Sequence, residues 1–149
     1  MKREDFEQVV ASTIARYRLL EADGGRVVVT LSGGADSVAL LEVLLSLGYQ
    51  VLAVHCNFHL RGDESNRDEA FARSVCAARG VELKVKHFDV VAYECEHGVS
   101  TEMACRDLRY AWFEQVRFEH NCQAIAVAHH ADDAVETFVL NAFRGTGVA

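Results

Sequence analysis

The chain has no proline among its 149 residues, so no proline-rich linker divides it. It also has no apolar run long enough to span a membrane, and its first ten residues, MKREDFEQVV, lack the apolar centre of a secretion signal. Gly/Ser tracts and internal repeats are absent as well. These absences predict one cytoplasmic domain, residues 1–149, that makes no contact with a membrane.

Two further features are scarce: paired cysteines and positive charge. The five cysteines are odd in number and none is spaced as CxxC, so we expect reduced thiols, most of them in the core. Only 15 Lys and Arg stand against 22 Asp and Glu, which gives a net charge of −7 and a pI of about 5.4. This balance argues against a nucleic-acid-binding surface on the chain by itself, since RNA affinity depends largely on Lys and Arg.

Short apolar runs alternate with helical patterns along the chain. Strands are expected at 26–31, 50–55, 82–88 and 124–128, and helices at 5–20, 37–47, 65–79, 101–119 and 132–143. The first run lacks polar alternation, which is typical of a strand buried on both faces, and the second is also expected to be buried. The pattern predicts an α/β fold with a parallel sheet of at least four strands and helices on both faces. Ligands of such sheets bind at the carboxyl ends of the strands, where the polar clusters of this sequence lie.

The first of these clusters is SGGADS, residues 32–37, between a buried strand and a helix. Backbone N–H groups and the helix N-terminus form an anion site there, and Gly33 and Gly34 permit positive φ and close approach of a phosphate. The loop is not a Walker loop, a dinucleotide fingerprint or a hydrolase elbow. A tight turn whose Asp or Ser caps the helix is the alternative without a ligand.

Two clusters follow in the middle of the chain. HCNFHLRGDES, residues 55–65, is either a polar loop or, on weak spacing, a zinc site made of His55, Cys56 and His59. Further on, Glu102, Arg106 and Arg109 lie along one helical stripe. That stripe is either a row of solvated ion pairs or a pair of arginines that face phosphates.

The last cluster is HHADDAVET, residues 129–137. On a helix, Asp132 and Glu136, and likewise Asp133 and Thr137, would be i, i+4 pairs. The carboxylates suit either the capping of a helix or a Mg²⁺ ion that touches phosphate oxygens. A metal-dependent phosphohydrolase of the "HD" kind is a further alternative.

These motifs together resemble a known family. SGGADS matches the SGGxDS loop of the PP-loop ATP pyrophosphatases at every fixed position. With NFHLRG, the ExxxRxxRY motif at 102–110, HxxDDxxET at 129–137 and RGTG near the end, the chain resembles the tRNA(Ile)-lysidine synthetases from about residue 26 to 147. Ala128 departs from the glycine expected there. Members of this family continue past RGTG into tRNA-binding domains, so we expect this chain to be a fragment that lacks them.

The resemblance implies a Rossmann-like PP-loop fold and an ATP-dependent ligase. ATP would adenylate the C2 oxygen of the wobble cytidine in an isoleucine tRNA with a CAU anticodon, and free L-lysine would then displace AMP. It implies ATP as substrate, Mg²⁺ as cofactor and tRNA contacts mostly outside this chain, and it leaves a homodimer open. The resemblance implies that the ATP phosphates are bound by Ser32, Gly33, Gly34, Ala35, Asp36, Ser37 and Arg106, and that Mg²⁺ is bound by Asp36, Asp132 and Asp133. It implies that Arg109 contacts the leaving pyrophosphate and that His129 and Thr137 lie near the nucleotide. Of these residues, Asp36, Arg109 and Asp133 are the implied catalytic ones.

Rival functions share the glycine loop. A tRNA thiolase would be expected to carry a set of catalytic or cluster-binding cysteines, and amide-forming PP-loop synthetases would lack NFHLRG and the arginine–tyrosine motif. A non-catalytic nucleotide-binding module would keep the glycines without needing Asp132 and Asp133.

Overall fold

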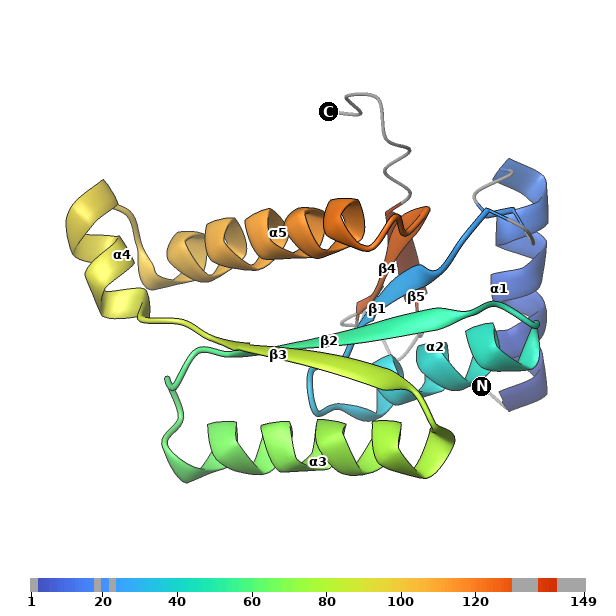
Figure 1. The fold of residues 1–149 in the computed structure, drawn as a ribbon, viewed down its shortest axis with the longest axis horizontal. Helices are drawn as coiled ribbons and strands as arrows, with labels where there is room; N and C mark the ends of the chain where they lie inside the picture. The colour runs from blue at the N-terminus through green and yellow to red at the C-terminus, as the bar shows by residue number, and fades with distance from the viewer. Residues whose placement is uncertain (1–2, 18–19, 22–23, 130–136, 142–149) are drawn as a thin grey trace.

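A computed structural model describes residues 3–17, 20–21, 24–129 and 137–141 (Figure 1). The strands of this part of the chain form one sheet in the order β3-β2-β1-β4-β5. Its first four members are parallel, and β5 is antiparallel to β4. The bounds are β1 (Val27–Thr30), β2 (Val51–Asn57), β3 (Glu82–His87), β4 (Ala124–His129) and β5 (Thr137–Asn141). The predicted α/β fold with a parallel sheet of at least four strands is confirmed.

Helices cover both faces of this sheet. Figure 1 shows α4 and α5 on one side, α2 and α3 on the other, and α1 beside α2. Their bounds are α1 (Arg3–Tyr17), α2 (Ala35–Ser46), α3 (Asp63–Arg79), α4 (Val90–His97) and α5 (Thr101–Glu119). No helix in these described ranges is long and apolar enough to cross a lipid bilayer.

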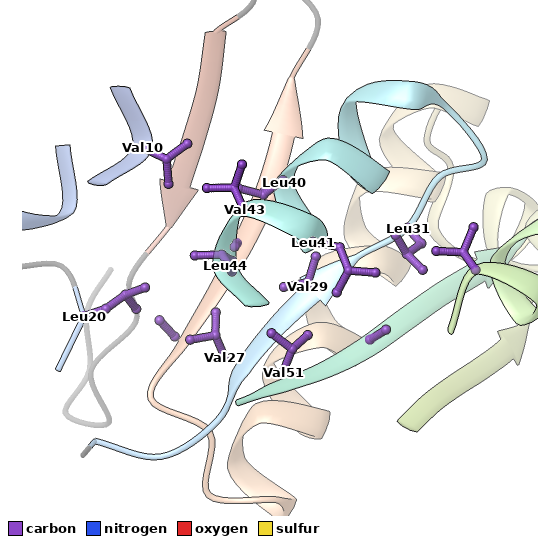
Figure 2. Close-up of a cluster of buried hydrophobic side chains, with 14 of the residues drawn as sticks. Val10, Leu20, Val27, Val29, Leu31, Leu40, Leu41, Val43, Leu44 and Val51 are labelled. Carbon is purple, nitrogen blue, oxygen red and sulfur yellow. The ribbon is translucent and has the colours of Figure 1, made fainter. Parts of the chain in front are cut away.

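The core consists of two layers because successive strand residues point to opposite faces of the sheet. Val27 and Val29 of β1 belong to the layer under α1 and α2, whereas Val28 between them packs under α5. Figure 2 shows Leu40 and Leu44 of α2 in the first layer, where both side chains are fully buried. Burying a leucine or valine contributes about 1.5–3 kcal/mol, so a strand covered on both faces favours consecutive apolar residues, as at Val27, Val28 and Val29 of β1.

One helix was missed by the sequence analysis, which expects a loop between residues 88 and 101. The helix α4 begins after Asp89, whose carboxylate accepts a hydrogen bond from the backbone N–H of Ala92 at 3.0 Å. Of its eight residues only Val90 is buried. A helix this short, with a single buried side chain, has no apolar periodicity to reveal it.

The expected helix at 132–143 is wrong where the structure describes it. Thr137–Asn141 is the strand β5, and its register pairs His129 of β4 with Thr137. Its sequence, TFVLN, is rich in β-branched and aromatic residues, and periodicity cannot separate a short apolar strand from a helix. The remainder of that prediction, residues 132–136 and 142–143, lies outside the described residues.

Candidate functional site

The glycine loop connects β1 to α2 at the carboxyl end of the sheet. Gly33 has a φ of +91°, and a Cβ built there would lie 2.7 Å from Cγ and Oδ1 of Asp68 in α3. Gly34 is the N-cap of α2 with φ −95° and ψ 161°, and a Cβ there meets nothing closer than Ser32 Oγ at 3.6 Å. Positive φ was expected at both glycines, and for Gly34 that expectation is wrong. The demand for glycine falls on Gly33.

Hydrogen bonds inside the loop fix its shape. The buried hydroxyl of Ser37 donates to the Gly34 carbonyl at 3.0 Å and accepts from the Ser32 N–H at 3.2 Å. The Gly34 N–H donates to the Ser32 hydroxyl at 3.4 Å. Ser37 therefore holds the loop together from inside, while Ser32 is exposed. Because the N-cap of α2 is a glycine, no side chain caps its first turn, which leaves a helix N-terminus of the kind that binds anions.

A cavity of about 410 Å³ lies at this end of the sheet. It brings together the glycine loop, the end of β2, the segment that follows β2, and α5, which are distant in the sequence. Its lining includes Ser32 and Ser37 of the loop, Cys56 and Asn57 of β2, Phe58, Leu60 and Arg61 after β2, Ser65 and Asp68 of α3, Arg109, Tyr110 and Phe113 of α5, and Ala128 of β4.

The structure separates the two arginines of the predicted stripe on α5. Arg109 lines the cavity, and its guanidinium carbon lies 5.3 Å from the centre of the Phe58 ring, within cation–π range. Arg106 is exposed and does not line the cavity. Phe58 in turn stacks on Phe88 at a centroid distance of 5.3 Å, so the aromatic core supports the position of Arg109.

Of the expected residues of the glycine loop, Ser32 and Ser37 line the cavity, whereas Gly33, Gly34 and Ala35 do not. Asp36 lies half-buried in the first turn of α2 and does not line it. His129 and Thr137 face each other across β4 and β5 by backbone register, and the structure describes only their backbones. Asp132 and Asp133 lie outside the described residues.

The segment after β2, whose sequence predicts no definite role, supplies Arg61 to the cavity. The Arg61 Nη2 lies 2.6 Å from Asp68 Oδ2, so this ion pair sits directly beside Gly33. Both residues are in the sequence HCNFHLRGDES or just after it. Only the fold shows that they approach the glycine loop.

The zinc hypothesis for His55, Cys56 and His59 finds no support. No group of three or more His, Cys, Asp or Glu side chains in the described part of the chain is placed to hold a metal ion. His59 Nε2 instead lies 2.6 Å from His87 Nδ1. Burial raises the pKa of the Cys56 thiol to about 12, with Arg109 opposing the shift, so this thiol is neutral at physiological pH.

His55 is buried and lines the cavity. Its Nδ1 lies 2.6 Å from the Leu31 carbonyl oxygen, so that nitrogen carries the proton and donates. The other nitrogen, Nε2, is buried without a hydrogen-bond partner in the described part of the chain. Sequence reasoning considered His55 only as a metal ligand.

A family model and several curated proteins match most of this chain. A family model described as a PP-loop domain matches residues 3–149. A tRNA(Ile)-lysidine synthase of Bacteroides thetaiotaomicron is 55% identical over 143 residues, which cover 96% of this chain and 33% of the relative. A protein of the same name from Clostridium perfringens strain 13 is 41% identical over 129 residues, covering 84% of this chain and 28% of the relative. The chain thus spans about a third of the length of these curated relatives.

Solved structures share the fold at low sequence identity. An NH3-dependent NAD synthetase from Campylobacter jejuni aligns with a TM-score of 0.60 and 19% identity, covering 85% of this chain and 56% of that one. An NMN synthetase from Francisella tularensis aligns with a TM-score of 0.58 and 16% identity, covering 85% and 53%. At this sequence identity, the comparison shows only that the strands and helices of these proteins are arranged in the same fold.

Proposed function

Because the chain belongs to the PP-loop domain family, we propose that its glycine loop binds the phosphates of ATP in an enzyme that forms lysidine in tRNA. The observation that carries this proposal is that Ser32 and Ser37 of the glycine loop line the cavity, and that Asp68, which also lines it, lies against Gly33. The backbone at Gly33 has positive φ and no side chain, and two arginines, Arg61 and Arg109, line the adjoining space. Together they suit a polyphosphate ligand.

The proposed reaction takes place in two steps. The C2 oxygen of the wobble cytidine attacks the α-phosphorus of ATP, the bond from that phosphorus to the bridging oxygen breaks, and pyrophosphate leaves with the electron pair. The ε-amine of free lysine then attacks C2, and the C2–O bond breaks as AMP leaves with the oxygen. Adenylation is needed because oxygen by itself is a poor leaving group.

The residues of this chain have separable roles in the first step. Backbone N–H groups at the start of α2 and the Ser32 hydroxyl would hold the phosphates, and Arg109 would stabilise the charge that develops on pyrophosphate. Ser37 would act by keeping the loop in shape, since its hydroxyl is committed to Gly34 and Ser32.

The proposal includes a Mg²⁺ ion because the sequence offers carboxylate ligands for it. Asp36 offers a carboxylate in the first turn of α2, within the glycine loop, and oxygen donors are what Mg²⁺ prefers. Asp36 would hold the ion with Asp132 and Asp133, and the ion would neutralise charge on the phosphates. If so, the Asp36→Asn variant and the unaltered chain should bind ATP with the same affinity in EDTA. Addition of Mg²⁺ should then increase the ATP affinity of the unaltered chain but not that of the variant.

The phosphate part of the proposal is tested by calorimetric titration of residues 1–149 with ATP, ADP and AMP. A pyrophosphate-binding loop predicts that ATP binds at least tenfold more tightly than AMP. Equal affinity for ATP and AMP would contradict it.

The tRNA part is tested in a longer protein. Residues 1–149 would replace the matching segment of the Bacteroides thetaiotaomicron relative, to which they are 55% identical. We expect the chimera to incorporate labelled lysine into an isoleucine tRNA transcript with a CAU anticodon and not into the same transcript with GAU. A folded chimera that binds ATP but labels neither transcript would favour the rival PP-loop activities.

A further inference from the structure

Arg61 and Arg109 reach the cavity from different parts of the chain. Arg61 follows β2, whereas Arg109 comes from α5, and both line the same cavity. The Arg61 guanidinium pairs with Asp68 at 2.6 Å and, more distantly, with Glu64 at 3.7 Å. The Asp68 carboxyl group lies 2.7 Å from where a Cβ on Gly33 would be. Asp68 therefore places Arg61 beside the one loop residue whose backbone demands glycine.

Hydrogen bonds hold the segment that carries Arg61 in place. Asn57, 1% exposed, accepts a hydrogen bond from the His59 N–H at 3.0 Å and donates to Glu69 Oε1 at 3.1 Å. The Arg61 N–H donates to the Ser65 hydroxyl at 3.1 Å. The backbone of Arg61 is thus fixed, and its side chain, 61% exposed, has room to move.

The charges of the cavity favour an anion although the whole chain has a net charge of −7. Its lining in the described part of the chain carries the cations Arg61 and Arg109 and the anion Asp68. A phosphate bound against Gly33 would meet the Asp68 carboxylate at close range, and two oxyanions repel each other there. Arg61 would pair more strongly with the phosphate, whose charge is higher and which accepts two parallel hydrogen bonds.

We propose that Arg61 is a polyphosphate-binding residue, and that Asp68 holds its guanidinium beside Gly33 until a phosphate takes the place of the carboxylate. The proposal rests on the proposed function in that the polyphosphate is ATP or its leaving pyrophosphate. Arg61 and Arg109 would then hold the leaving pyrophosphate from two sides.

The test is a titration of residues 1–149 with pyrophosphate and with ATP, each in EDTA and in Mg²⁺. We expect Arg61→Ala to weaken binding of both ligands about tenfold or more, and Arg61→Lys to weaken it less because the charge is kept. Arg67→Ala is the matched control, since Arg67 is an exposed arginine of α3 that does not line the cavity. It removes the same charge one residue from Asp68 and should change affinity less than threefold.

The displacement of Asp68 has its own signature. Asp68→Asn should tighten binding several-fold, because it removes the repulsion of the phosphate and also releases Arg61. In the Arg61→Ala background the gain should shrink to the part that comes from the lost repulsion. A variant that merely disturbs the fold would lower affinity in both backgrounds and lower the melting temperature. If Asp68→Asn weakens binding in Mg²⁺ but not in EDTA, Asp68 is a metal ligand. That result would overturn the proposal that a phosphate replaces the Asp68 carboxylate as the partner of Arg61.

Failure of this inference and failure of the proposed function are distinguishable. If Gly33→Ala abolishes ATP binding while Arg61→Ala binds as the unaltered chain does, the role of Arg61 is overturned and the phosphate loop stands. If the unaltered chain binds neither ATP nor pyrophosphate, both are overturned.

Discussion

At Gly33 the backbone has a φ of +91°, and a methyl group would meet Asp68 Cγ at 2.7 Å. We therefore expect Gly33→Ala to weaken ATP binding at least tenfold and to destabilise the fold by about 1–2 kcal/mol, the cost of a left-handed conformation for a residue with a Cβ. Calorimetric titration with ATP and urea unfolding measure the two effects.

Gly34→Ala is the matched control for that change, because its φ is −95° and its nearest neighbour would be Ser32 Oγ at 3.6 Å. It should keep both stability and ATP affinity close to those of the unaltered chain. Loss of ATP binding in the Gly34 variant alone would show that the phosphate approaches Gly34 rather than Gly33.

Cysteine reactivity offers a second prediction at the level of single residues. Cys95 is exposed, whereas Cys56 lines the cavity with a pKa raised by burial to about 12. Because the thiolate is the nucleophile, iodoacetamide at pH 8 should alkylate Cys95 first and leave Cys56 unmodified for much longer. Peptide mass spectrometry over a time course measures this order. Early alkylation of Cys56 would mean that Arg109, which lowers the pKa, outweighs burial.

At the level of elements, an ion pair ties the start of β1 to the start of β3 across β2. Arg26 Nη1 lies 2.9 Å from Glu82 Oε1, and this hydrogen bond lowers the pKa of Glu82 below its ordinary 4.5. A carboxylate with a lowered pKa contributes stability above the unfolded pKa and loses it as the pH falls through the folded value. The contribution is small, at most about 1 kcal/mol, because the Glu82 side chain is 52% exposed.

We therefore expect Glu82→Gln to be slightly less stable than the unaltered chain at pH 7, with the difference vanishing as the pH falls below 4.5. Urea unfolding of both proteins across that range measures it. The Arg26→Ala variant should show the same pH dependence. A difference that stays constant with pH would mean that packing, and not the charge of Glu82, causes it.

At the level of the whole molecule, the net charge of −7 bears on the proposed substrate. RNA affinity comes largely from Lys and Arg that neutralise phosphates, and Arg109 and Arg61 face the cavity. We expect residues 1–149 to bind a CAU-anticodon tRNA at least tenfold more weakly than the full-length Bacteroides thetaiotaomicron relative does. Filter binding of both proteins at one moderate salt concentration measures this. Comparable affinities would place an RNA-binding surface within residues 1–149.

Most of the fold was predictable because its elements have strong local signals. The helix α5 was predicted with its observed bounds, since 19 residues of amphipathic sequence follow Ser100, whose hydroxyl caps Met103 N–H at 3.2 Å. The strands β1, β2 and β4 were predictable because burial on both faces favours runs of apolar residues, whereas β3, with the sequence ELKVKH, is a half-exposed edge strand with an alternating pattern. The helix α4 and the strand β5 were not predictable, because each is short and is stabilised by a neighbouring element: α4 contacts α5, and β5 pairs with β4.

The same distinction applies to the site. The sequence by itself determined the glycine loop and the position of an arginine pair on α5, because turn chemistry and helical spacing are local properties. Only the tertiary structure decided that Arg109 and not Arg106 faces the cavity, that Gly33 and not Gly34 needs to be glycine, and that Arg61 and Asp68 reach the loop. These are contacts between segments distant in the chain, and they follow from how the helices pack on the sheet, which no local pattern encodes.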